Sequence, residues 1–280
     1  MSEPSLPERV ERYYAAVPLM FAGAEEFGSL RLFVRKEAGA PYYGGPAHAQ
    51  PTGDAEVTAA DVARVRARQR ELGVPQSFEW LAEAAPGMRR VVEGAGLPVA
   101  ERPLMVLDGE PASVPLPDGV SLRVVEDDDP LLPAVLAVPR LAFGEPGSTG
   151  RDELARAAAE VGADGTLDAV RPTLRDGRKV LVAAVGPGGV PFAVGHYHPA
   201  VGVTEIGGVG TLPEARRQGL GAAVTAALAV HARENGVRTV FLAYALDSVA
   251  RIYARLGFSA VPVTLLVADQ PARGAGAVGP

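Results

Sequence analysis

Two arginines, a glutamine and two glycines stand together in the stretch P-E-A-R-R-Q-G-L-G (213–221), and a helical pattern, A-A-V-T-A-A-L-A-V-H-A-R-E, follows directly. The amino terminus of a helix offers unpaired backbone N–H groups and the positive end of the helix dipole. Glycine lets an anion approach those N–H groups because it has no Cβ atom. This combination of residues predicts a binding site for a negatively charged group.

Three kinds of anion site use glycines ahead of a helix. A P-loop requires Lys-Ser or Lys-Thr after the glycines, and neither pair follows here. A dinucleotide site requires a third glycine, at a position that holds Val224 in this chain. The remaining option is a pyrophosphate held by consecutive backbone N–H groups, with the arginines adding positive charge.

The longer stretch V-G-T-L-P-E-A-R-R-Q-G-L-G resembles the acyl-coenzyme A loop of the GNAT acyltransferase superfamily. That family's pattern, Gln/Arg-x-x-Gly-x-Gly/Ala after a strand and a proline, is matched by Arg216, Gly219 and Gly221. Further along, I-Y-A-R-L-G-F resembles the family's Tyr-x-x-x-Gly-Phe ending. The resemblance covers 180–267, with weaker support back to 120. Two motifs in this order carry it, because either one alone arises often by chance.

The resemblance implies how acetyl-CoA would bind as a co-substrate. In the family, the strand before the loop diverges from its neighbour, and its free backbone groups hydrogen-bond the pantetheine amides. The backbone N–H groups of 217–222 would then hold the pyrophosphate. The coenzyme-binding residues implied in this way are Val209, Gly210, Thr211, Arg216, Arg217, Gln218, Gly219, Leu220, Gly221 and Ala222.

The family's reaction is the attack of a free amine on a thioester carbonyl, which needs a proton acceptor for the ammonium and a proton donor for the departing thiolate. The resemblance places Tyr253 near the sulfur as the donor and Glu205 on the strand leading to the loop as the base. His196, Tyr197 and His198 on the neighbouring strand are alternatives that would act as base or shape the acceptor pocket. The chain contains no cysteine, so direct transfer in a ternary complex is the simpler hypothesis.

Two further positions bear on this site. His231 follows Leu220, Val224 and Leu228 on one apolar stripe of the helix, so we expect it to pack rather than to react. Relatives in the family often carry asparagine seven residues before the tyrosine, where this chain has Leu246. This departure puts coenzyme contacts from that segment in doubt.

Apolar runs and turn residues predict the elements that position these residues. Glycine at 257 is a suitable left-handed end for the second of the helices that carry the motifs. We expect strands at 120–125, 181–185, 192–198, 203–212, 239–245 and 261–267, and helices from the glycine loop to 235, at 247–256 and in pieces across 131–176.

The first part of the chain echoes the second. R-E-L-G-V-P-Q-S-F-E-W-L-A-E (70–83) with M-R-R-V-V-E-G-A-G-L (88–97) resembles R-E-N-G-V-R-T-V-F-L-A-Y-A (233–245) with V-A-R-I-Y-A-R-L-G-F (249–258). The first part has no counterpart of the glycine loop. We therefore predict an α/β (α+β) fold of two GNAT-like units, each a twisted mixed β-sheet flanked by helices, with the site in the second. The predicted divisions are a degenerate first unit (1–108), a linker (109–119), a catalytic unit (120–268) and a disordered tail (269–280).

Composition narrows the functional classes. The formal net charge of −6 and the lack of a Lys/Arg-dense block argue against a nucleic-acid partner. No apolar run is long enough to span a membrane, and the first residues contain no apolar signal region, so we expect a cytoplasmic protein. His196 and His198 form a pair without a third ligand nearby, so we expect no metal site.

These observations favour an N-acetyltransferase that moves an acetyl group from acetyl-CoA to a primary amine, with a small molecule as the expected acceptor. Two alternatives keep the same coenzyme site: an acyltransferase for a hydroxyl or a longer acyl group, and a non-catalytic acyl-CoA sensor or scaffold. The identity of the acceptor, the general base, a homodimer and any ligand of the first unit are left open by the sequence.

Overall fold

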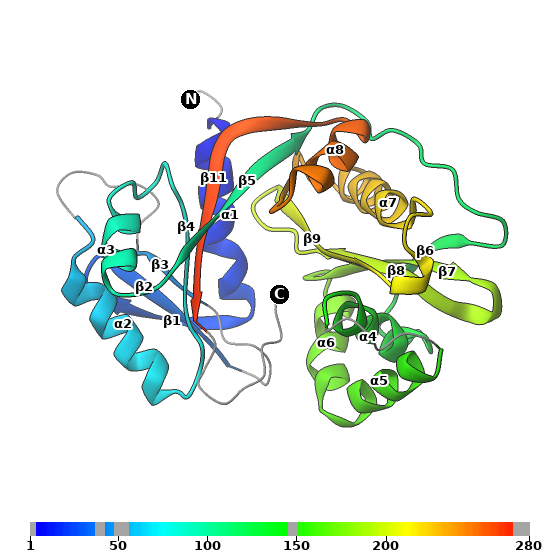
Figure 1. Ribbon diagram of the computed structural model, residues 1–280, viewed down its shortest axis with the longest axis horizontal. Coiled ribbons are helices and arrows are strands. Elements are labelled where there is room, and N and C mark those ends of the chain that lie inside the picture. The colour runs from blue at the N-terminus through cyan, green and yellow to red at the C-terminus, as the bar shows by residue number, and fades with distance from the viewer. Residues whose placement is uncertain (1–3, 37–42, 48–55, 145–150, 271–280) are drawn as a thin grey trace. The chain divides into compact units, whose positions relative to one another are not determined.

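The computed structural model of the chain describes residues 4–36, 43–47, 56–144 and 151–270. These residues pack as two compact units (Figure 1). Of the described residues, unit 1 comprises those within 4–104, 243–245 and 260–270, and unit 2 those within 105–242 and 246–259.

The units differ from the sequence-based divisions at two places. Residues 105–119, expected as the end of the first unit and a linker, are grouped with unit 2. Residues 260–268, expected in the catalytic unit, are grouped with unit 1, because the final strand pairs antiparallel with a strand of that unit. Of the predicted tail, Asp269 and Gln270 end this strand, and 271–280 lie outside the described residues.

Unit 1 is a mixed sheet in the order β1-β2-β3-β4-β11-β5. β3 and β4 run parallel, joined through a crossover that contains α2, whereas β1–β2, β2–β3 and β4–β11 are antiparallel. The elements are α1 (Leu6–Ala16), a 3₁₀ turn (Val17–Met20), β1 (Ala22–Phe27), β2 (Leu30–Arg35), β3 (Gly44–Pro46), α2 (Ala59–Glu71), β4 (Gln76–Leu81), α3 (Met88–Gly94), β5 (Val99–Leu107) and β11 (Phe258–Gln270).

The core of unit 1 lies between its sheet and the helices α2 and α3. Val62 and Val65 of α2 pack with Phe78 and Trp80 of β4 and with Val92 of α3. All five side chains are buried, so hydrophobic burial fixes this helical layer on the sheet. In Figure 1, α1 lies on the other side of the sheet from α2 and α3.

Unit 2 is a sheet in the order β10-β9-β8-β7-β6, in which only the β9–β10 pair is parallel. Figure 1 shows α7 on one face of this sheet and the helices α4, α5 and α6 on the other. The elements are β6 (Ser121–Val125), α4 (Leu132–Ala142), α5 (Arg151–Ala163), α6 (Thr166–Arg175), β7 (Val180–Gly186), β8 (Val190–Tyr197), β9 (Val203–Thr211), α7 (Leu220–Glu234), β10 (Thr239–Ala243) and α8 (Asp247–Arg255), with 3₁₀ turns at Pro187–Gly189 and Pro213–Ala215.

The elements expected from the sequence are present, with small shifts at their ends. The largest shift is in the last strand, which runs over Phe258–Gln270 instead of 261–267. The predicted apolar stripe of α7 is buried at Leu220, Val224 and Leu228. His231, which we expect to pack on this stripe, is half-buried, and its Nδ1 lies 2.8 Å from the hydroxyl of Tyr197.

The amino terminus of α2 is closed by a network around Asp61. The side chain of Thr58 accepts a hydrogen bond from the Asp61 N–H, and the Asp61 carboxylate accepts from the Thr58 N–H, which makes a capping box. The same carboxylate accepts from the Ser29 hydroxyl and pairs with Arg64. Burial by itself would raise the pKa of Asp61, but the hydrogen bonds from Arg64, Thr58 and Ser29 lower it to about 2.

We predict that Asp61 makes the stability of unit 1 depend on acid pH. A carboxyl whose pKa is lower in the folded state stabilises the fold above its unfolded pKa and loses that effect as the pH falls through the folded pKa. The free energy of unfolding should therefore drop by at most about 2 kcal/mol between neutral pH and pH of about 2. Trp80 is the only tryptophan in the chain, so urea unfolding followed by its fluorescence reports on unit 1.

The variant Asp61→Asn should unfold at lower urea concentration at pH 7 and should lose this contribution to the acid dependence. Asp118→Asn, a change of an exposed aspartate in unit 2, serves as the control and should leave the unit 1 transition in place. An unchanged pH profile in Asp61→Asn would contradict the assignment.

Candidate active site

The parallel pairing of β9 with β10 ends before β9 does. Three register pairs join the strands, and the last is Glu205 with Phe241, while β9 continues to Thr211. On the other edge of β9, the register with β8 shifts between Val194 and His196, and Gly208 has a φ of 59°. Such a bulge re-aims the strand. The β10-facing edge of β9 beyond Glu205 is therefore available to a ligand with peptide-like amides.

The loop after β9 exposes backbone donors. Arg217 has a φ of 65° and Gly219, the N-cap of α7, has a φ of 79°, both in the left-handed region. Left-handed residues within a turn aim successive N–H groups toward one point, which makes an anion-binding concavity. Among the described residues, no side chain caps α7 and no acidic residue stands in its first turn. The local structure therefore exposes backbone donors at the place where the glycine loop predicts an anion site.

The two arginines of the loop differ in their surroundings. The Arg216 guanidinium donates to the Ala142 carbonyl at 2.8 Å and to the Thr211 carbonyl at 3.4 Å. It therefore ties the loop to the end of α4 and to the end of β9. Arg217 and Gln218 are exposed side chains. Of the two arginines, Arg217 is the better placed to lend charge to a bound anion, because the Arg216 side chain is engaged with the protein backbone.

Glycine is needed where the end of β9 meets its neighbours. A Cβ atom on Gly210 would lie 2.9 Å from the Cβ of Ala142, so no larger residue fits there without a shift. A Cβ atom on Gly221 would lie 3.5 Å from Thr211 Oγ1 and 3.7 Å from Val209 Cγ1, an ordinary contact. The first turn of α7 therefore lies directly beside the end of β9.

The structure brings most of the predicted coenzyme-binding residues together at this junction. Val209, Gly210 and Thr211 form the end of β9, and Arg216 to Ala222 form the loop and the first turn of α7. The side chain of Leu220 is only 1% exposed, so this residue has only its backbone to offer a ligand. Ala142, whose carbonyl accepts from Arg216, could not be predicted, because nothing in the sequence links the end of α4 to the loop.

Tyr253 lies on α8 in unit 2. Its ring is half-buried, and its centroid is 6.1 Å from that of Phe258. Burial raises the pKa of the Tyr253 phenol, so the hydroxyl keeps its proton at neutral pH. A protonated phenol can donate a hydrogen bond where negative charge develops.

Glu205 is half-buried at the last register pair of β9. His196 pairs with Gly207, so alternation places Glu205 and His196 on the same face of the sheet. Burial lowers the pKa of His196 well below the usual value, and the charges of Lys179 and His198 lower it further. His196 is therefore neutral at pH 7 and a weak base.

The other two candidate bases have their own partners. The Nδ1 atom of His198 lies 2.9 Å from the Arg178 carbonyl, which can only accept, so Nδ1 carries the proton. Tyr197 points to the opposite face of the sheet, where it contacts His231, and burial raises its pKa to about 12. Tyr197 therefore lies away from the face that holds Glu205.

The described residues contain neither a metal-binding group nor a membrane-spanning helix. Their histidines, aspartates and glutamates form no group of three that would hold a metal ion. None of their helices combines the length and the apolar character that a membrane crossing needs.

These features define an α/β protein whose second unit has an open strand edge leading to an uncapped helix terminus. Residues 151–258 match the sequence model of the family described as the Acetyltransferase (GNAT) family. Residues 151–258 therefore form a domain of the GNAT acetyltransferase family, as the two motifs predicted.

Two curated relatives are both named mycothiol acetyltransferase. The protein of Actinosynnema mirum is 36% identical over 163 residues, which are 55% of this chain and 49% of that protein. The protein of Arthrobacter sp. (strain FB24) is 35% identical over 167 residues, which are 56% of this chain and 47% of that protein. The chain thus spans about half the length of the curated relatives it matches.

Solved structures support the two-unit fold. A GCN5-related N-acetyltransferase from Kribbella flavida matches with a TM-score of 0.67 at 24% identity, over 98% of each chain. A tandem GNAT protein from the clavulanic acid biosynthesis pathway matches with a TM-score of 0.57 at 18% identity, over 99% of this chain and 90% of that one. The predicted fold of two GNAT-like units is therefore confirmed.

Leu246, the position that departs from the family pattern, stands at the start of α8, where its effect on stability can be tested. Leu246 is the N-cap of α8, its backbone is extended, its side chain is 63% exposed, and it makes no capping hydrogen bond. We predict that Leu246→Asn stabilises unit 2 by about 1 kcal/mol, because asparagine is a good N-cap and leucine is a poor one. The midpoint of thermal unfolding should rise by about 2–4 °C.

Leu246→Ala is the matched control for this change, because it removes the exposed leucine without supplying a cap. It should leave the midpoint of thermal unfolding near that of the wild type. Equal midpoints for the asparagine and alanine variants would show that capping does not limit α8.

Proposed function

We propose that the chain transfers an acetyl group from acetyl-CoA to a primary amine by direct attack in a ternary complex. The observation that carries this proposal is the continuity between the unpaired edge of β9 and the uncapped amino terminus of α7. The pantetheine amides would hydrogen-bond the β9 edge, and the pyrophosphate would accept from the N–H groups of 217–222. A helix amino terminus without an acidic residue suits a doubly charged pyrophosphate.

The chemical step follows from the two titratable groups. The ammonium form of the acceptor gives a proton to Glu205, and the free amine attacks the thioester carbonyl. The new C–N bond forms as the C–S bond breaks, and the departing thiolate takes a proton from Tyr253. The nitrogen, which is cationic after the attack, loses its second proton, a proton returns to the Tyr253 phenolate, and Glu205 releases its proton to solvent. Because burial favours the neutral phenol, Tyr253 starts the reaction with its proton in place. Glu205 is the proposed base. The His196 imidazole on the same face of the sheet is the weaker candidate, because burial lowers its pKa.

The acceptor is proposed on the family's reaction alone. The named relatives are mycothiol acetyltransferases, and the chain spans only about half of each, so their acceptor is not transferred to this protein. A small-molecule amine, a cytoplasmic location and the lack of a nucleic-acid partner stay predictions.

The coenzyme site is tested by Gly221→Glu. A glutamate in the first turn suits the helix dipole, so α7 should keep its stability, but its charge would repel a pyrophosphate at the same N–H groups. Calorimetric titration should show that acetyl-CoA binds the wild type and binds the variant more weakly by at least about tenfold, or about 1.4 kcal/mol.

Gly162→Glu is the matched control, since Gly162 is a helical glycine of unit 2 with open space around it. This control should bind acetyl-CoA as the wild type does. Equal affinity in Gly221→Glu and the wild type would mean that the loop does not hold the pyrophosphate, and the acyltransferase proposal would fall.

The proton donor is tested by Tyr253→Phe. Loss of the hydroxyl should lower kcat by about a hundredfold, the lower part of the range for general acid catalysis, and leave the KM for acetyl-CoA nearly unchanged. Release of free coenzyme A thiol with a panel of primary amines measures both constants. In the wild type, the raised pKa of Tyr253 should keep the donor active above the pH at which an ordinary tyrosine loses its proton.

Tyr13→Phe, which removes a hydroxyl from a buried tyrosine of unit 1, is the control and should retain turnover. Full activity of a folded Tyr253→Phe would exclude the donor role. Binding of acetyl-CoA by the wild type without turnover of any amine would instead indicate a sensor.

A further inference from the structure

The face of β9 that carries Glu205 also carries three glycines. A Cβ atom on Gly207 would lie 3.8 Å from Nε2 of His196, and one on Gly208 would lie 2.5 Å from Cε1 of the same ring. The bulge therefore turns both glycines to the face of His196. Alternation from Gly208 puts Gly210 on this face as well, so the face runs from Glu205 to Gly210 without a side chain of its own.

The opposite face of the sheet is closed by α7, which lies across the sheet from α4 (Figure 1). A Cβ atom on Gly195 of β8 would lie 2.8 Å from Leu228 and 3.1 Å from Val224, and both of these α7 side chains are buried. A cavity of about 300 Å³ on this side is lined by Tyr197 and His231, at the end of α7 that lies away from the glycine loop. An acceptor amine therefore reaches Glu205 from the face on which α4 ends.

Phe143 is the large side chain with which α4 meets this face. A Cβ atom on Gly210 would lie 3.4 Å from Cε2 and 3.6 Å from Cζ of the Phe143 ring. Of the eight phenylalanines in the chain, Phe143 is the only exposed one, and it is 49% exposed. A single exposed apolar side chain is common on protein surfaces. This one, however, contacts the strand that would hold the reacting groups.

The backbone on both sides of this ring is fixed. The Phe143 N–H donates to the Pro139 carbonyl at 3.0 Å, and the Ala142 carbonyl accepts from the Arg216 guanidinium at 2.8 Å. Arg216 belongs to the loop that would hold the pyrophosphate, so the place of the ring is tied to the coenzyme site. A ring held in this way is preorganised for binding, because little further ordering is needed when a ligand covers it.

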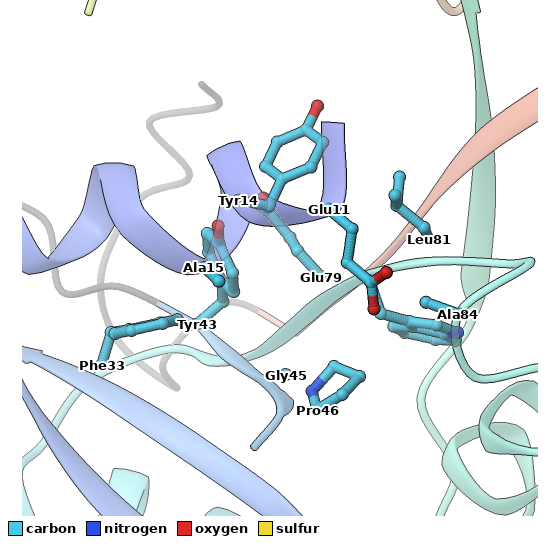
Figure 2. A pocket seen from close by; sticks show the side chains of 11 residues that line it. Glu11, Tyr14, Ala15, Phe33, Tyr43, Gly45, Pro46, Glu79, Leu81 and Ala84 are labelled. Atoms are coloured by element: carbon cyan, nitrogen blue, oxygen red, sulfur yellow. The ribbon is translucent and has the colours of Figure 1, made fainter. Parts of the chain in front are cut away.

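A cavity of unit 1 differs from this half-open site. It measures about 50 Å³, and Glu11 of α1 and Trp80 of β4 are among the residues that line it (Figure 2). Pockets for small molecules usually measure about 300–1,000 Å³. The rings of Phe33 and Tyr43, which also line the cavity, pack edge to face with centroids 5.8 Å apart. These rings pack with each other, whereas Phe143 has no aromatic neighbour among the described residues.

The separation along β9 determines the shape of the acceptor. Glu205 and Gly210 are five residues apart, which is at most roughly 17 Å along an extended strand. The Glu205 side chain and the Phe143 ring both lie on this face and shorten the distance that a ligand must span. An amine at Glu205 can therefore touch Phe143 only with a group that stands several bonds from its nitrogen.

We propose that Phe143 determines acceptor specificity and selects an elongated primary amine with an apolar group several bonds from its nitrogen. This inference rests on the proposed function, because it requires an acceptor amine at Glu205. The nitrogen lies at Glu205, and the apolar group covers the Phe143 ring beside Gly210. Binding then removes the exposed part of the ring and the apolar group of the acceptor from water together.

Two amines with the same chain test this proposal: 4-phenylbutylamine and butylamine. Release of free coenzyme A thiol gives kcat/KM for each, and the wild type should prefer 4-phenylbutylamine by at least about tenfold. Phe143→Ala should remove most of this preference, mainly through a higher KM for 4-phenylbutylamine. Phe143→Leu keeps an apolar side chain and should retain most of the preference.

Val230→Ala is the matched control, because it shortens an exposed apolar side chain on α7. It should keep the preference, and calorimetry should show that all three variants bind acetyl-CoA as the wild type does. Equal kcat/KM for the two amines in the wild type, or an unchanged preference in Phe143→Ala, would overturn this inference and leave the transferase standing.

Weaker binding of acetyl-CoA to a folded Phe143→Ala would also overturn the inference, because the ring would then serve the coenzyme. Absence of turnover with every primary amine, although acetyl-CoA binds, would instead overturn the proposed function and this inference with it.

Discussion

The end of the parallel pairing between β9 and β10 is the constraint on which the candidate active site depends. Because β9 continues past Glu205 while β10 does not follow it, the second half of β9 keeps an edge for a ligand. The bulge at Gly208 and the contact of Gly210 with Ala142 hold this half of the strand in its diverging course. Without the divergence, the strand edge would be filled by β10.

The two units differ in how the helix beside the parallel strand pair begins. In unit 2 the helix after the diverging strand begins at a glycine, without a cap or an acid, and so presents free donors to an anion. In unit 1 the helix begins with a capping box, and its donors are already engaged. The two units thus share a helix between the strands of a parallel pair but differ in whether its first N–H groups are already engaged.

Burial sets the proton chemistry on both sides of the proposed reaction. It raises the pKa of Tyr253, which keeps a donor protonated, and lowers that of His196, which keeps an imidazole neutral. Both shifts follow from the same cause, because a low-dielectric surrounding disfavours whichever form is charged. The result is a neutral phenol on α8 and a neutral imidazole on β8.

The sequence by itself determined the local features. The glycine loop, the helix that follows it and the tyrosine motif are short patterns whose meaning depends on backbone geometry within a few residues, so the family, the order of elements and the internal repeat could be read from it. The structure confirms the α/β elements and the two-unit fold. The roles of Tyr253 and Glu205 stay predictions, because they depend on a bound substrate.

Only the tertiary structure decided which distant segments meet. The pairing of β11 with β4, which moves 260–270 into unit 1, depends on long-range hydrogen bonds that leave no local pattern in the sequence. The same holds for the contact of Arg216 with Ala142, and for the cavity that gathers Glu11 and Trp80. Periodicity reports how each element forms, but the partner of each element is selected by packing of the whole chain.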